Sequence, residues 1–468
     1  MKRFTLSVAV AVALAISVGA QDYRSRIIQT LGGKKSTVQA MNRSGQVTGA
    51  ADINNRFVEQ PHAFLWSKTS GTQDLGTLGG NFSYGSFVND LGQVAGASSL
   101  AGDSVYHAFR WTASSGMQDL GSFGGGGSNP YGMNAAGTVV GFSSTSSNMA
   151  RAFRWTPSGG MQDLGFGDGS LAVAINDLDE VLGTACTGSC STLHSYLWSS
   201  SHGVESLDFP GSTYTRVLAI NNSEQVVGQY STAAGIFSFL WSRSGGFQTL
   251  PSLGGNRSAA SAINAVGQVG GYSCLSGSNP PCHAFLWSST SGIQDLGAPP
   301  NLDQSGVLAL NIHGEVLGAA ASSRSEVFQY FDWTSGAGLK AFPYAGNRNS
   351  APGALNDAGQ IAQQRAVIGF VLTPVMHVTL TSSLNPSKKG QAVTFTATVT
   401  SVVGAPPDGE LITFKMGGKP IGSVALIRGT ANFTTSALTL GTHGITASYP
   451  GDVNYDHGFA GLQQVVNP

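Results

Sequence analysis

The chain has 468 residues, of which 64 are Gly and only 10% are charged. Long amphipathic helices would need more Glu, Lys and Leu, so this composition indicates many short strands joined by turns. The net charge is −1 and no run of like charges occurs, which leaves no electrostatic argument for binding nucleic acid or an anionic membrane.

Residues 1–20 have the pattern of a secretory signal peptide. Lys2 and Arg3 precede an apolar stretch that ends in the small residues Val18-Gly19-Ala20. This stretch is too short to be a stable membrane span. We therefore expect a secreted chain that begins at Gln21, either extracellular, at the cell surface or in the periplasm, with no membrane span.

A repeat of 42 to 47 residues occupies most of the chain after this segment. A Gly, or in two units an acidic residue, stands three positions after a repeated Asn, and Val or Ile stands five positions after it. Asn-x-x-Gly predicts a tight turn in which the Asn side chain bonds its own backbone and Gly adopts positive φ. The repeated residues are Asn42, Asn89, Asn134, Asn176, Asn221, Asn264, Asn311 and Asn356.

An aromatic segment ending in Trp follows in each of the first seven units, and an apolar residue stands nine positions after each Trp. Each unit therefore contains four strand-like runs, the size of one propeller blade. We interpret the Trp side chains as packing between neighbouring sheets, with sugar stacking as the alternative. The residues are Trp66, Trp111, Trp155, Trp198, Trp241, Trp287 and Trp333, which are all the Trp of the chain.

The two ends of the repeat region predict how it closes. The eighth unit has three strand-like runs, while residues 26–33 resemble the fourth run of the first unit, residues 73–80. An N-terminal strand that completed the last sheet would remove two exposed sheet edges. We therefore predict an all-β fold whose residues 21–374 form an eight-bladed β-propeller with four strands per blade.

Four cysteines form two close pairs, Cys186 with Cys190 and Cys274 with Cys282. Export permits disulfides, so we expect two local disulfides. The alternative is a metal site, which would need further His or Cys ligands nearby, and His194 alone is thin support for it. Both pairs fall between the second and third strands. In a propeller these loops share a face with the connections between blades, which makes this face the candidate for ligand contact.

The triplet His-Ala-Phe begins the aromatic run at residues 62–64, 107–109 and 283–285. In this respect the sequence resembles the secreted bacterial proteins with the HAF repeat, over roughly residues 26–373. The resemblance implies an extracellular location and no established activity. Units five, seven and eight lack the leading His, so no function that every unit shares depends on it.

Residues 375–468 lose the 45-residue period and alternate in the manner of β-strands, as in Val393–Thr400 and Ile412–Met416. About seven such runs in some 90 residues are typical of a sandwich. The segment Tyr449–Tyr455 resembles the end of bacterial Ig-like repeat domains, although the region has no Cys or Trp. We expect an Ig-like β-sandwich that acts as a spacer or adhesion module.

The recurrent polar residues favour structural roles over chemistry. Four histidines recur near the start of the aromatic run, namely His62, His107, His194 and His283. They are either metal ligands or bases, or strand residues that are hydrogen-bonded within their own blade. The second role is favoured because repetition around a ring places these residues apart from one another. Asp74, Asp119, Asp163 and Asp295 are either acid pairs of a glycosidase or strand-end hydrogen-bond acceptors, which we favour. The full calcium-loop series and the common catalytic motifs are missing, so we expect no cofactor, no metal and no catalytic residue.

These patterns favour a secreted, monomeric, non-catalytic binding or structural protein. One propeller face would bind a protein or a glycan, and the Ig-like domain would be a stalk. The alternative is a carbohydrate-active propeller enzyme, a lyase or a hydrolase, with its site at the axial mouth. Non-repeated acids, His or Arg gathered at one end of the channel would favour the enzyme.

Overall fold

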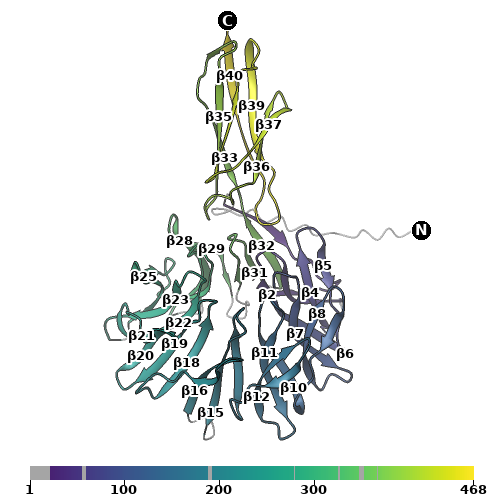
Figure 1. The fold of residues 1–468 in the computed structure, drawn as a ribbon, viewed down its shortest axis with the longest axis vertical. Helices are drawn as coiled ribbons and strands as arrows, with labels where there is room; N and C mark the ends of the chain where they lie inside the picture. Colours follow the sequence, from purple (N-terminus) through teal and green to yellow (C-terminus); the bar gives the residue numbers. More distant parts are fainter. Residues whose placement is uncertain are drawn as a thin grey trace, which may run out of the picture.

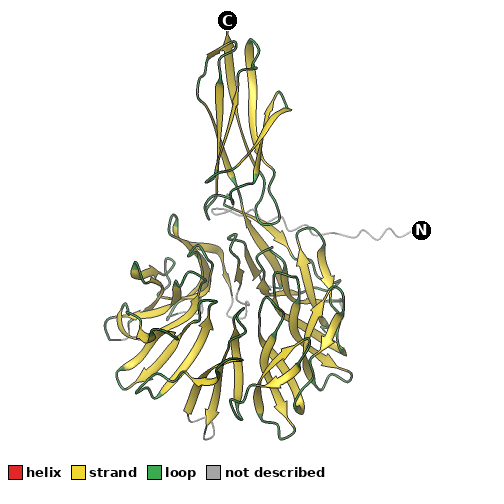
Figure 2. Cartoon of the chain, in the orientation of Figure 1, coloured by secondary structure: helices red, strands yellow, loops and turns green. Residues whose placement is uncertain are grey.

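The computed structural model describes residues 22–54, 59–187, 192–278, 280–324, 327–346, 353–365 and 367–468. Within these ranges all regular elements are strands (Figures 1 and 2). The described part has no helix that is long and apolar enough to cross a membrane. The expected signal peptide, residues 1–20, lies outside the described residues.

Within each of the first seven sequence units four strands pair in chain order, and single parallel contacts join the second unit to the third and the fifth unit to the sixth in eight-stranded sheets. Units one to four contain β2 (Ser36–Met41), β3 (Val47–Asp52), β4 (Pro61–Ser67), β5 (Gly71–Asp74), β6 (Gly79–Val88), β7 (Val94–Leu100), β8 (Tyr106–Thr112), β9 (Gly116–Asp119), β10 (Gly124–Met133), β11 (Val139–Thr145), β12 (Ala150–Thr156), β13 (Gly160–Asp163), β14 (Ser170–Ile175), β15 (Val181–Thr187), β16 (Thr192–Ser199) and β17 (Gly203–Ser206).

Units five to eight continue the same order. They contain β18 (Tyr214–Ile220), β19 (Gln225–Thr232), β20 (Gly235–Ser242), β21 (Gly246–Thr249), β22 (Gly254–Ile263), β23 (Val269–Leu275), β24 (Cys282–Ser288), β25 (Gly292–Gly297), β26 (Gln304–Leu310), β27 (Val316–Ala321), β28 (Phe328–Thr334), β29 (Gly338–Gly346), β30 (Ala354–Leu355), β31 (Ile361–Arg365) and β32 (Ile368–Pro374). The result is a propeller-like array of open sheets (Figure 1).

The N-terminal strand β1 (Tyr23–Ile27) is the fourth strand of the last sheet, where it pairs antiparallel with β32. The next hydrogen bond, from Ile28 N to Gly369 O, repeats the bond from Leu75 N to Ala63 O in the first unit. The sequence places this strand at residues 26–33. The structure shifts it toward the N-terminus, because the chain turns at Thr30, whose hydroxyl bonds Gly33 O.

The repeated Asn builds both a turn and a link between units. In the first unit, Asn42 Oδ1 accepts the backbone N–H groups of Ser44 and Gln46, which closes the turn on which Gly45 has a φ of 70°. The Nδ2 group of each Asn donates to the backbone carbonyl of the Asn in the next unit, at 2.8–3.3 Å. Asn356 donates to Asn42 O, so this series of bonds returns to its start.

Apolar clusters between consecutive units contain the Trp side chains. Trp111 packs with Leu75 of the preceding unit, and Trp66 packs with Ile28 and Val371 of the last one. Five of the seven Trp are 3–6% exposed, while Trp198 and Trp241 are partly buried. The Trp side chains are therefore packed between sheets, as the first interpretation predicts, with Trp198 and Trp241 less completely covered than the other five.

The C-terminal domain is a two-sheet sandwich. One sheet has the order β33 (His377–Ser382), β35 (Val393–Thr400) and β38 (Thr430–Thr435). The other has the order β34 (Ser387–Lys388), β40 (Gly458–Asn467), β39 (Gly441–Tyr449), β36 (Leu411–Met416) and β37 (Lys419–Ala425). Alternate residues of the facing strands, such as Phe395 and Phe414, are fully buried between the sheets.

Candidate functional site

The sandwich contacts one face of the propeller-like array through the segment 449–457. Lys68 Nζ donates to Asp452 O, and Gln360 Nε2 donates to Val453 O at 3.1 Å. Lys68 lies on a turn between third and fourth strands, and Gln360 follows an Asn turn. The sandwich therefore sits on the face formed by these turns (Figure 1).

The opposite face carries the loops between second and third strands together with the connections between units. In the second unit these segments are bonded to each other, since Asn81 N donates to Asp103 Oδ1 at 2.6 Å. This is the face that the cysteine positions indicate as the ligand face. The sandwich leaves this face uncovered (Figure 1).

Each leading His on this face is paired with an Asp of its own unit. The Nδ1 atoms of His62, His107 and His283 lie 2.8–3.0 Å from Asp74, Asp119 and Asp295. His194 pairs with Asp208 instead, and in the third unit Arg151 takes the place of His and pairs with Asp163. Each pair lies within one unit and joins the third strand to the end of the fourth. This agrees with the interpretation that these His side chains are hydrogen-bonded within their own blade.

The carboxylates of these pairs also hold the strand ends. Asp74 Oδ1 accepts the backbone N–H of Gly76 at 2.8 Å. Burial alone would raise the pKa of Asp74, but the hydrogen bonds from His62 and Gly76 outweigh it and keep this pKa below its ordinary value. The Asp is therefore a charged acceptor that fixes the end of the strand.

A pocket of about 270 Å³ opens on this face between the sixth and seventh units. Its walls include Arg257, Tyr272 and Cys282 of the sixth unit and Gln304 and Phe328 of the seventh. Three consecutive alanines, residues 319–321, also line it, where the sixth unit has Tyr-Ser-Cys at the equivalent positions 272–274. Small side chains on β27 therefore leave the space that larger ones would fill.

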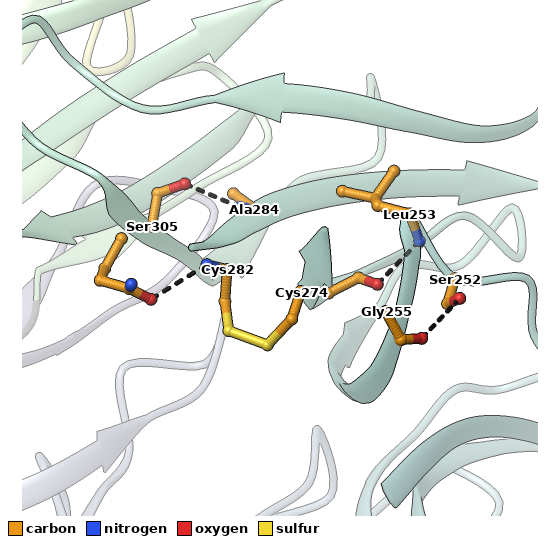
Figure 3. The surroundings of a disulfide bond; sticks show 9 residues. Ser252, Leu253, Gly255, Cys274, Cys282, Ala284 and Ser305 are labelled. Atoms are coloured by element: carbon orange, nitrogen blue, oxygen red, sulfur yellow. Dashed lines mark hydrogen bonds between the residues drawn. A yellow bond between two sulfur atoms is a disulfide. The ribbon is translucent and has the colours of Figure 1, made fainter. Parts of the chain in front are cut away.

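A disulfide joins Cys274 and Cys282 beside this pocket, across the paired strands β23 and β24 (Figure 3). The Cys282 N–H donates to Gln304 Oε1 at 3.0 Å, which ties the disulfide strand to the next unit. The structure thus contains one of the two expected disulfides. The other, Cys186 with Cys190, is not described because residues 188–191 lie outside the described ranges.

A buried carboxyl pair that the repeat does not predict lies between the seventh and eighth units. Tyr23 Oη donates to Asp332 Oδ2 at 2.9 Å and lies 3.4 Å from Glu315 Oε1, while Asn311 Nδ2 donates to Glu315 Oε2. Burial first, and the Asp332 carboxylate second, raise the pKa of Glu315 to about 9, and burial raises that of Asp332 as well.

This carboxyl pair joins strands of two neighbouring sheets. Glu315 directly precedes the second strand of its unit, Asp332 is in the third, and Tyr23 comes from the outermost strand of the next sheet. A second group of non-repeated charges is ion-paired, since Arg243 contacts Glu180, Glu205 and Glu224. Within the described ranges, no group of three or more His, Cys, Asp and Glu side chains is arranged to hold a metal ion.

Buried serines link the units at the loop face, and the sequence interpretation missed them. Ser83 Oγ accepts Ala63 N of the preceding unit at 2.8 Å and donates to Gly76 O. The same acceptor role recurs at Ser128, Ser170, Ser258, Ser305 and Ser36, the last of which accepts Gly369 N. A Ser or Thr stands six positions before the repeated Asn in all eight units, and this signal would have revealed the link.

The solved structures that resemble the chain have low scores. A streptogramin B lyase has 9% identity and a TM-score of 0.37, covering 76% of this chain and 100% of its own. Dipeptidyl peptidase 4 of Porphyromonas gingivalis has 9% identity and a TM-score of 0.44, covering 91% and 66%. The extracellular domain of a one-component system from B. thetaiotaomicron has 10% identity and a TM-score of 0.27, covering 94% and 88%. At these values the likenesses assign no function.

A search of curated proteins finds no match to the chain. Residues 380–467 match the family model described as bacterial Ig-like domain (group 3). The two-sheet topology of this segment and its shared apolar core agree with that match. The C-terminal part of the chain is therefore a bacterial Ig-like domain.

Proposed function

We propose that the protein is a secreted, non-catalytic binding protein, built as a closed eight-bladed propeller with a C-terminal Ig-like domain. The returning series of Asn hydrogen bonds supports the closed ring. The disulfide and the bacterial Ig-like domain support a location outside the cytoplasm.

The observation that carries the binding role is the open pocket on the loop face. It combines two aromatic rings with an arginine and an amide, a composition typical of ligand sites. The Ig-like domain occupies the opposite face, so a ligand reaches this pocket without displacing the domain. It acts as the spacer that presents the loop face outward.

The described charged residues support binding over catalysis. The His–Asp pairs lie in separate units, the Arg243 group is ion-paired, and the carboxyl pair lies between sheets. None of these arrangements places a base beside a nucleophile at the pocket. We therefore propose that the pocket binds its ligand without cleaving it.

The test uses the mature chain with a glycan array, a panel of extracellular proteins and a parallel screen for polysaccharide degradation. We expect at least one ligand to bind, and we expect this binding to be lost in Phe328→Ala. The control Phe459→Ala removes an exposed ring of the Ig-like domain and should retain the binding. Degradation of a glycan that one substitution abolishes would overturn the non-catalytic role. Binding that depends on the Ig-like domain alone would also overturn the proposal.

A further inference from the structure

The pocket between the sixth and seventh units contains a cation without an internal counter-ion. Arg257 is exposed on the innermost strand β22, and no described carboxylate pairs with its guanidinium. Five arginines of the described residues, among them Arg24 with Asp456 and Arg154 with Asp179, are ion-paired, whereas Arg257 is not and also lines a pocket. In a chain with few charges, this guanidinium is available to an anionic ligand.

Two aromatic residues line the same pocket as Arg257. Tyr272 and Phe328 are partly exposed and belong to different units, so their rings line the pocket from both sheets. Gln304 Oε1 is held by the Cys282 N–H, which leaves the two Nε2 donors for a ligand. The pocket therefore offers apolar ring surface, two amide donors and a planar cation.

We infer that this pocket binds an acidic sugar residue of a polysaccharide, a uronic acid. A guanidinium binds a carboxylate in bidentate fashion, an amide donates to hydroxyls, and aromatic rings cover the C–H face of a pyranose. The pocket volume lies just under the range of about 300–1,000 Å³ for drug-sized ligands, which fits one sugar residue. An acidic peptide side chain would satisfy Arg257 but leave both rings uncovered.

This inference rests on the proposed function and names its ligand class. The experiment titrates the full mature chain by calorimetry with oligogalacturonate and oligoalginate, and with dextran and chitooligosaccharide as neutral glycans. Poly-glutamate tests for an acidic peptide. We expect an acidic oligosaccharide to bind and the neutral glycans and poly-glutamate to bind at least tenfold more weakly.

Two variants test the pocket itself. Arg257→Gln should weaken binding of the acidic oligosaccharide about tenfold or more, because hydrogen bonds to a charged group are among the strongest. Tyr272→Ala should weaken it by a similar factor. The matched control is Arg216→Gln, which removes the same charge from another exposed site on an innermost strand and should change affinity less than twofold.

Three results would overturn the inference. They are equal binding of neutral glycans, equal binding of poly-glutamate, and unchanged affinity in Arg257→Gln. If a neutral glycan or a protein binds through Phe328 while acidic sugars do not bind, the inference fails and the proposed function stands. If no tested ligand depends on the loop face, both fail.

Discussion

At the scale of single residues, the repeated Asn does two tasks that are usually separate. Its carbonyl oxygen closes the turn between the first and second strands, while its amide nitrogen reaches the backbone of the next unit. Asn264 is 6% exposed, so its loss would leave the turn amides of Val266 and Gln268 without their acceptor and would remove one of the two hydrogen bonds to Asn311 O.

We predict that Asn264→Ala lowers the free energy of unfolding by about 1–3 kcal/mol, the cost of leaving buried polar groups unpaired. Guanidinium denaturation followed by Trp fluorescence measures this change. The control is Asn222→Ala, which removes exposed hydrogen bonds to Asp177 and should change stability by less than about 0.5 kcal/mol. Equal effects at the two positions would contradict the role of the buried Asn.

Glu315 takes the position that Gln occupies in five other units, four residues after the Asn. Its carboxyl is protonated in the fold because burial and Asp332 raise its pKa to about 9, while the unfolded chain ionises near 4.5. The folded state therefore holds an extra proton. The contribution of the protonated Glu315 carboxyl to the stability of the fold is fully present below about pH 4.5 and is lost as the pH rises toward 9.

We predict that Glu315→Gln flattens this pH dependence and makes the variant more stable than the parent at pH 8.5. Denaturation midpoints at pH 5, 7 and 8.5 measure the effect. Glu180→Gln is the matched control at the same repeat position. Because Glu180 is paired with Arg243, its substitution should destabilise the protein. A parent protein whose midpoint does not fall between pH 5 and 8.5 would exclude a protonated Glu315.

At the scale of elements, the strand pair β23 and β24 is joined by a disulfide. Cys274 and Cys282 are directly opposite each other in the register, and eight residues separate them. The bond restricts the unfolded chain only over this short loop, which limits its effect to about 2.5 kcal/mol in the chain-entropy model. It also fixes the strand whose N–H holds Gln304 in the pocket wall.

We predict that the double variant Cys274→Ser, Cys282→Ser folds but loses up to about 2.5 kcal/mol of stability. Thermal unfolding with and without reductant measures this, and reductant should affect the parent but not the double variant at this site. Ligand affinity at the pocket should also fall in this variant. Without the disulfide, the strand whose Cys282 N–H holds Gln304 Oε1 is less firmly fixed. A double variant as stable as the parent under oxidising conditions would contradict this role.

At the scale of the whole molecule, the Ig-like domain lies where the chain ends of the propeller meet. It contacts Arg24 of the N-terminal strand, Lys68 of the first unit and Gln360 of the last. Ala358 belongs to the apolar core of the Ig-like domain, and a Cβ on Gly359 would lie 2.4 Å from Val403. These contacts connect the Ig-like domain to the first and the last sheets of the repeat region.

We predict that removing residues 376–468 lowers the unfolding temperature of the propeller. All seven Trp lie in the repeat region, so Trp fluorescence reports that region alone. In the full chain, Asp456→Asn weakens the contact with Arg24 and should shift the same transition in the same direction by a smaller amount. A Trp transition that both changes leave in place would mean that the domain is only a spacer.

Sequence alone determined the features that depend on near neighbours in the chain. The all-β class, the repeat period, the Asn turn and the sandwich pattern all follow from local turn chemistry and alternation. The pairing of the N-terminal strand with the last unit was also predictable, because its sequence matches that of a fourth strand. Its bounds were not, since they depend on where the chain turns at Thr30.

Only the tertiary structure decided which distant residues meet. The bond from Asn356 to Asn42, the contact of Tyr23 with Asp332, and the space above the alanines of β27 each join segments of different units. No local pattern specifies them, because their energy comes from groups brought together by packing of whole sheets. The position of the Ig-like domain on the other face was decided in the same way, by its contacts with Arg24 and Gln360.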